Sequence, residues 1–121
     1  MATKRPERIK IISKRFNLDY LPEGQAPLAD DRMGECDTMN QKILVQEGLK
    51  FDTEREVILH ETLHAISDEM NLDLTEHQVE GTAKGILSVL IDNPSFAKFL
   101  LKRETKIGKT KIQDELRGKH L

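Results

Sequence analysis

Apolar and polar positions alternate roughly in the first third of the chain, and this pattern predicts strands. Residues 8–20 (RIKIISKRFNLDY) are partly β-branched and predict one strand. Residues 21–34 contain two prolines and two glycines, which predicts a loop. Two short strand-like runs follow around a polar turn near Asn40, and KILVQ (42–46) has the clearer strand pattern. A hairpin is the simplest connection between them.

The pattern becomes helical from Asp52 or Thr53 and continues to about Met70. Thr53 and Glu56 have the spacing of a capping box, in which each side chain satisfies a free backbone amide. One apolar stripe of this helix consists of Leu59, Leu63, Ile66 and Met70, while Val57, Ile58 and Ala65 fall elsewhere around it. A helix that is apolar on more than one face is expected at the centre of its domain.

Two further helices are predicted after the break NLDLTEHQ. Asp73 with Glu76, or Thr75 with Gln78, can cap a second helix that reaches Ile91. Pro94 ends it, because proline supplies no amide and disfavours helix at the preceding residue. A third helix, SFAKFLLKRE, follows. We therefore expect an α+β fold in which a small antiparallel sheet packs on the first helix.

Composition narrows the choice of function. The 121 residues fit one domain, and the charged residues (33%) nearly cancel to a net charge of -2. No global basic field favours nucleic acid, although the lysines of the tail 102–121 leave salt-sensitive DNA binding as a third hypothesis. We expect that tail to be mobile. The single cysteine, Cys36, and the lack of a long apolar run indicate a cytoplasmic protein without a membrane segment.

The first helix carries the motif His60-Glu61-Thr62-Leu63-His64, or HExxH. Residues four apart lie one above the other on a helix, so both imidazoles can share one zinc ion. Glu61 lies about a hundred degrees around the helix, beside the metal, where it can take a proton from a bound water. The alternative is that both histidines are ordinary polar residues. The apolar residues on either side of the motif argue against this alternative, because polar histidines in a core-facing helix would need partners, and a metal ion supplies one.

The run from KILVQ through VILHETLHAI to the second helix, covering about residues 33–95, resembles the minimal gluzincin core of metallopeptidases of the ImmA/IrrE type. It is more similar still to small metallopeptidases encoded by phages. The resemblance implies a zincin-like domain over residues 1–101, a zinc site of two histidines and one glutamate, and a substrate strand along the sheet edge. For a phage protein, the location would be the host cytoplasm. In relatives of the ImmA/IrrE type the cleaved partner is often a DNA-bound repressor.

Three residues after the break are candidates for the third zinc ligand: Glu76, His77 and Glu80. The apolar face of the second helix contains Val79, Ala83, Ile86, Leu87 and Leu90, and this face must pack on the HExxH helix. Glu76 falls within that arc, Glu80 at its margin and His77 well off it. We favour Glu76, with Glu80 as the alternative. A His77 ligand would make the site resemble SprT-type proteases, but their usual HG pair is absent.

We therefore predict a zinc-dependent endopeptidase in which Glu61 is the general base and KILVQ, as an edge strand, pairs with an extended protein or peptide substrate. The alternative is a non-catalytic zinc-binding interaction or regulatory module with the same fold. Cys36 could reach the zinc and inhibit the enzyme as a thiolate ligand, but we expect it to be a buried free cysteine. Tyr20 could stabilise an oxyanion, but a core position is the better expectation.

Overall fold

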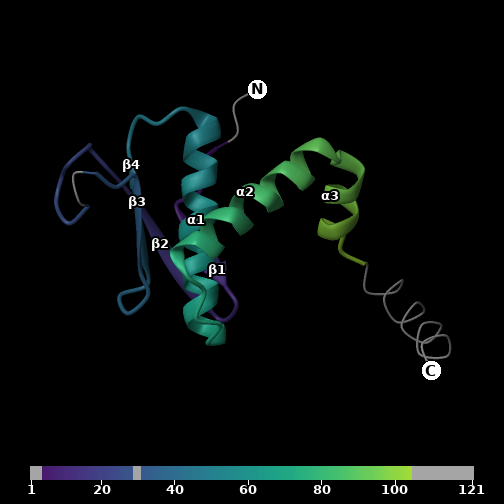
Figure 1. Ribbon diagram of the computed structural model, residues 1–121, viewed down its shortest axis with the longest axis horizontal. Helices are drawn as coiled ribbons and strands as arrows, with labels where there is room; N and C mark the ends of the chain where they lie inside the picture. The colour runs from purple at the N-terminus through teal and green to yellow at the C-terminus, as the bar shows by residue number, and fades with distance from the viewer. Residues whose placement is uncertain (1–3, 29–30, 105–121) are drawn as a thin grey trace. The chain divides into compact units, whose positions relative to one another are not determined.

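A computed structural model describes residues 4–28 and 31–104, which form a four-stranded sheet and three helices (Figure 1). The α+β class predicted from the sequence is confirmed. The chain divides into two compact units, Met1–Leu87 and Ser88–Leu121, so that the boundary falls within the second helix. The single domain predicted over residues 1–101 stays a prediction.

The sheet contains strands β1 (Arg8–Ile11), β2 (Lys14–Leu21), β3 (Gly34–Asp37) and β4 (Lys42–Gln46) in the order β1-β2-β4-β3. It is mixed, because β4 pairs in parallel with β2, while the other two pairings are antiparallel. The prediction of an antiparallel sheet was therefore wrong for the β2–β4 pairing. The prediction that KILVQ is an edge strand was also wrong, because β4 lies between β2 and β3. The reason lies in β4 itself, where Ile43, Leu44 and Val45 are all buried. Successive side chains point to opposite faces, so three buried residues in a row require a strand covered on both faces.

Residues 8–20 form a hairpin rather than the single strand that was predicted. The turn is Ile12-Ser13, between β1 and β2, and Ile12 has a φ of 58°. Tight hairpin turns that need a positive φ usually carry Gly, Asn or Asp, and the chain has none at this point. A β-branched residue in that conformation gives no turn signal in the sequence. The predicted hairpin around Asn40 is confirmed as β3 and β4.

Helix α1 (Phe51–Met70) lies along one face of the sheet (Figure 1). It begins earlier than predicted. Its N-cap is Lys50, which makes no side-chain capping bond, so Thr53 lies inside the helix and the predicted Thr53–Glu56 capping box was wrong. Helix and sheet enclose a core of Ile11, Phe16, Leu18, Ile43, Val45, Val57 and Ala65.

Helix α2 spans Glu76–Asp92, and Val79 and Ala83 in its first half form a second buried cluster with Leu63 of α1. The Thr75–Gln78 capping box is confirmed. The backbone amide of Gln78 donates to Thr75 Oγ1 at 3.1 Å, and the backbone amide of Thr75 donates to Gln78 Oε1 at 2.9 Å. The linker is held by a bond of 2.9 Å from the Leu74 amide to Ser67 Oγ. These contacts place the first turn of α2 beside the middle of α1.

In the second unit, α3 (Pro94–Leu101) confirms the third helix predicted over residues 95–104, but it begins one residue earlier, with Pro94 in its first turn, and ends at Leu101. Most of the tail predicted over 102–121 lies outside the described residues. Among the residues that the structure describes, no helix is both long and apolar enough to cross a membrane.

Candidate metal centre

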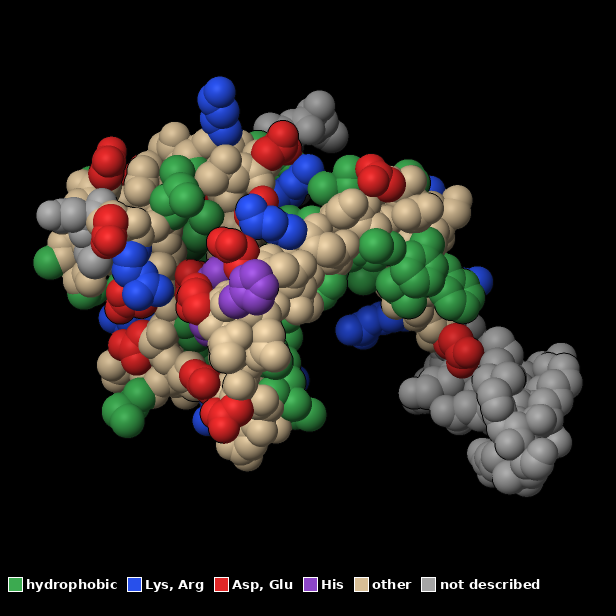
Figure 2. All heavy atoms as spheres, viewed as in Figure 1, with side chains coloured by type: hydrophobic (Ala, Val, Ile, Leu, Met, Phe, Trp, Pro, Cys, Tyr) green, Lys and Arg blue, Asp and Glu red, His purple; other side chains and the backbone are tan. Residues whose placement is uncertain are grey.

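The two motif histidines point to one place on the α2 side of α1. Their ring centroids are 5.0 Å apart, as expected for residues separated by one helical turn. His60 Nε2 lies 2.6 Å from Glu76 Oε1, and His64 Nε2 lies 2.9 Å from Glu76 Oε2. One carboxylate therefore faces both imidazoles. In Figure 2, histidine and acidic side chains gather on the face shown.

Glu76 reaches this position because it opens α2. The capping box starts the helix at that residue, and Val79, one turn later, is fully buried next to Leu63 of α1. The carboxylate itself remains 64% exposed. Burial acts to raise its pKa, but the hydrogen bond with His60 and the charges of His64 and His60 together lower the pKa of Glu76 below its usual range. An ionised carboxylate is the form that binds metals.

The three side chains form a group that can hold a metal ion. Ligand atoms of His60, His64 and Glu76 all lie within 4.8 Å of one another, and within residues 4–28 and 31–104 no other set of three such residues does so. His64 Nε2 is also buried and makes no hydrogen bond, although Glu76 Oε2 lies 2.9 Å away as an ion-pair partner. A buried polar atom without a partner costs free energy, and a metal ion would satisfy this one. Two imidazoles and a carboxylate leave a coordination position open.

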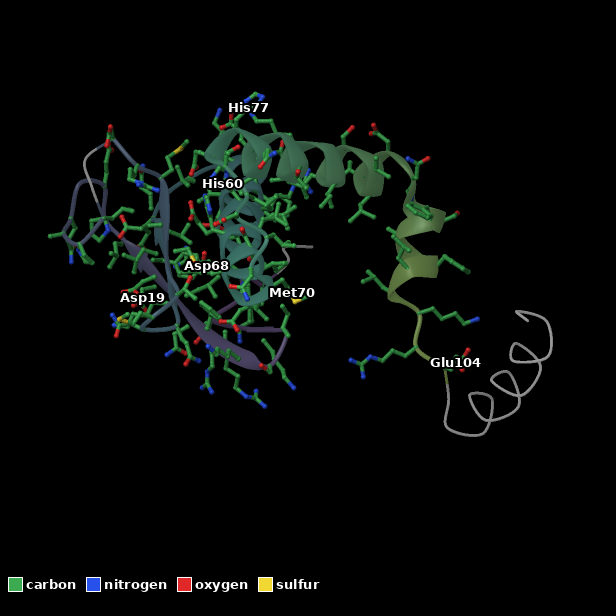
Figure 3. All side chains as sticks on the ribbon, turned by 60° about the horizontal axis from the view of Figure 1, so that its bottom comes forward. Asp19, His60, Asp68, Met70, His77 and Glu104 are labelled. Carbon is green, nitrogen blue, oxygen red and sulfur yellow. The ribbon has the colours of Figure 1, made fainter. Side chains whose placement is uncertain are left out.

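The other candidates for the third ligand do not join this group. His77 is exposed and projects on the outer side of α2, away from His60 (Figure 3). Glu80 lines a hollow beside the cluster, but it is not among the converging ligands. Of the alternatives that the sequence leaves open, the structure therefore brings Glu76 to the histidines.

Glu61 is turned toward the sheet side of the cluster. Its side chain is 4% exposed, and Oε1 makes no hydrogen bond. Burial raises the pKa of the Glu61 carboxyl, while the charges of His60, His64 and Arg32 act in the opposite direction. A buried carboxylate next to possible metal ligands, with a free oxygen, can accept a proton from a water or other acid placed there.

Gly34 makes room for this carboxylate. A Cβ atom on Gly34 would lie 2.5 Å from Val57 Cγ1 and 3.1 Å from Glu61 Cγ and Oε2. Strand β3 therefore approaches α1 closely at Glu61, which only glycine permits. Sequence reasoning assigned no role to Gly34, because a glycine at the end of a loop is an ordinary turn residue.

Two hollows border the cluster. The first, here called the Glu80 hollow, has a volume of about 570 Å³ and is lined by Arg32, Gly34, Glu56, His60, Glu61 and Glu80, among others. The second, the Asp68 hollow, measures about 260 Å³ and is lined by Arg32, Glu35, Cys36, His64 and Asp68, among others. Glu61 and Glu76 line both. Sequence reasoning also missed Arg32, because it lies in a segment without a motif.

Cys36 and Tyr20 lie outside the ligand group. The Cys36 Sγ atom is 3.5 Å from Thr38 Oγ1, burial raises the pKa of its thiol to about 11, and its sulfur is not among the converging ligand atoms. Tyr20 donates a hydrogen bond to the carbonyl of Pro6, and the guanidinium of Arg5 covers its ring at 3.8 Å. Tyr20 lines a different hollow from the histidines, and its contacts with Pro6 and Arg5 are those of a structural residue.

Comparison with known proteins adds no relative: no family model, no curated protein sequence and no solved structure matches the chain significantly.

Proposed function

We propose that this protein is a zinc-dependent endopeptidase. The observation that carries the proposal is the meeting of His60, His64 and Glu76 beside the buried carboxylate of Glu61, whose Oε1 makes no hydrogen bond. Two histidines and one glutamate are a ligand set typical of catalytic zinc in peptidases, with Glu61 placed as general base. His64 Nε2 supports the fit, since it is buried and makes no hydrogen bond.

An extended substrate has a strand to pair with. Met33 O accepts a bond of 2.8 Å from the Gln46 amide, and hydrogen-bonded pairs alternate along an antiparallel ladder. Glu35 and Asp37 therefore direct their backbone groups to β4, whereas Gly34 and Cys36 direct theirs to the open edge of the sheet. Addition of a peptide at that edge would lay its backbone next to Glu61, because Gly34 is in close contact with Glu61.

The reaction follows from these positions. Zinc, when bound, supplies a Lewis acid that lowers the pKa of water and polarises a carbonyl. His60, His64 and Glu76 would hold the ion. Glu61 takes the proton of the attacking water as the new C–O bond forms, and then passes it to the amide nitrogen as the C–N bond breaks. The products are one carboxylate and one amine, which balances the hydrolysis.

Metal content and cleavage test the proposal together. Purified protein loaded with zinc and freed of excess ion should contain about one zinc per chain. It should cleave a pool of quenched fluorescent peptides or casein, and a chelator should stop the cleavage. Glu61→Gln should retain the zinc and lose hydrolysis by about 100-fold or more, because Gln accepts no proton. Glu80→Gln is the matched control, since Glu80 lines the hollow without joining the ligands.

The outcomes separate the proposal from its alternatives. Zinc bound at the site without cleavage of any substrate would favour a non-catalytic zinc-binding module. Zinc content near zero in loaded wild-type protein would refute the site itself. Loss of zinc in Glu61→Gln would make Glu61 a ligand instead of the base.

A further inference from the structure

Arg32 has a distinctive position beside the candidate site. Its side chain lines both the Glu80 hollow and the Asp68 hollow. Among the described residues that line the two hollows, it is the only lysine or arginine. A cation shared by both hollows lies where they meet, next to Glu61 and Glu76, which line both as well.

The side chain of Arg32 is anchored at one end. Its Nε donates a hydrogen bond of 3.3 Å to the carbonyl oxygen of Gly34. That oxygen belongs to the open edge of β3, as the alternation of the β3–β4 ladder requires. Neither terminal amino group of the guanidinium makes an ion pair or hydrogen bond with the residues that the structure describes. These groups are free to donate to a ligand bound along the edge.

The charges around the hollows are otherwise negative. Carboxylates of Asp31, Glu35, Glu56, Asp68 and Glu80 line one hollow or the other, in addition to Glu61 and Glu76. Glu56 is neutralised by Lys84, whose Nζ lies 3.2 Å from its Oε1. A substrate oxygen that gains negative charge in this surrounding needs a positive group near it, and positioned donors aimed at such an oxygen are often the largest single contribution to catalysis.

We propose that Arg32 is a catalytic residue that donates hydrogen bonds to the carbonyl oxygen of the peptide bond being cleaved. This inference rests on the proposed peptidase function. When water adds to the carbonyl carbon, the electron pair of the C=O bond moves onto the oxygen, and the guanidinium stabilises the resulting oxyanion. When the C–N bond breaks, the pair returns to re-form C=O, and the proton held by Glu61 goes to the leaving nitrogen. Arg32 itself gains and loses no proton.

The test compares Arg32→Gln and Arg32→Lys with Arg15→Gln, a control on β2 that lines neither hollow. With a quenched peptide that the wild type cleaves, Arg32→Gln should lower kcat about 100-fold, the effect of removing one oxyanion donor in other enzymes. KM and zinc affinity should stay within about threefold. Arg32→Lys should recover part of kcat, because it keeps the charge without the fork of donors. Arg15→Gln should equal the wild type.

A peptide phosphonate adds a readout that a structural role would not move. It mimics the charged, tetrahedral transition state, so its affinity in calorimetry should fall by about the same factor as kcat/KM in Arg32→Gln. Unchanged kcat, or a loss of kcat that accompanies loss of zinc, would overturn the assignment. A raised KM with normal kcat would also overturn it and would show instead that Arg32 binds a carboxylate of the substrate. If the wild type cleaves no peptide at all, the proposed function fails first, and this inference fails with it.

Discussion

Two stretches of α2 and its continuation differ in burial, and the stretch with more apolar residues is the less buried one. In the first half of α2, Val79 and Ala83 are 0% and 1% exposed and pack next to Leu63 of α1. After Ser88, Val89 and Ile91 are each 46% exposed, and α3 has no buried residue. An apolar stripe shows which side of a helix can be buried, whereas burial itself depends on a partner surface. The stretch that has such a partner is also the one that brings Glu76 to the histidines.

The largest expected effect concerns the two glutamates of α2 that compete as ligands. Glu76→Ala should weaken zinc binding by more than about 100-fold. Removing a residue that only hydrogen-bonds to a metal ligand already lowers metal affinity by about 10–100-fold, and Glu76 is proposed as a ligand itself. Glu80→Ala, one turn further along the helix, should change it by less than about threefold. Competition with a chromogenic chelator measures both. If only Glu80→Ala loses zinc affinity, the third ligand is Glu80, one helical turn after Glu76.

The next effect tests the difference in burial directly. Val79→Ala should lower the free energy of unfolding by about 2 kcal/mol, because it removes two fully buried methyl groups and leaves a cavity beside α1. Val89→Ala, the same substitution at a half-exposed position, should change it by no more than about 0.5 kcal/mol. Urea denaturation of the metal-free protein gives both values. Equal losses would mean that the stretch after Ser88 is covered by a partner surface.

The start of α2 should contribute a smaller amount. Thr75→Ala removes the acceptor of the Gln78 amide and should cost about 1 kcal/mol of stability. Thr82→Ala, at an exposed position within the helix, is the control and should be close to neutral. If Thr75→Ala also weakens zinc binding, the cap positions Glu76 in addition to stabilising the helix. A zinc titration run with the denaturation curves distinguishes the two results.

The smallest expected effect has the opposite sign. Gly85→Ala should stabilise the protein by about 0.7 kcal/mol, because a Cβ there meets no atom within 4 Å and alanine loses less backbone entropy in a helix. Gly34→Ala should instead destabilise it, since its Cβ would lie 2.5 Å from Val57 Cγ1. Thermal melts of the two variants provide the check. A stabilising Gly34→Ala would contradict the close approach of β3 to Glu61.

The site and helix features that were predicted correctly depend on local geometry, although the equally local Thr53–Glu56 capping box does not form. His60 and His64 converge because a separation of four residues on any α-helix places them on one face. The Thr75–Gln78 box and the stop at Pro94 were also predictable, since each depends on a few neighbouring residues. The Ile12-Ser13 turn was missed because it contains no Gly, Asn or Asp, and a β-branched residue such as Ile12 rarely adopts a positive φ.

The sequence by itself determined the α+β class, the paired histidines and the position of Glu61 beside them. Only the tertiary structure decided that Glu76 faces both histidines, that β3 rather than β4 forms the open edge, and that Arg32 lies between the two hollows. The physical reason is the range of the interactions. Helix geometry fixes spacing over a few residues, whereas the pairing of strands and the packing of α2 on α1 depend on which distant apolar surfaces bury each other.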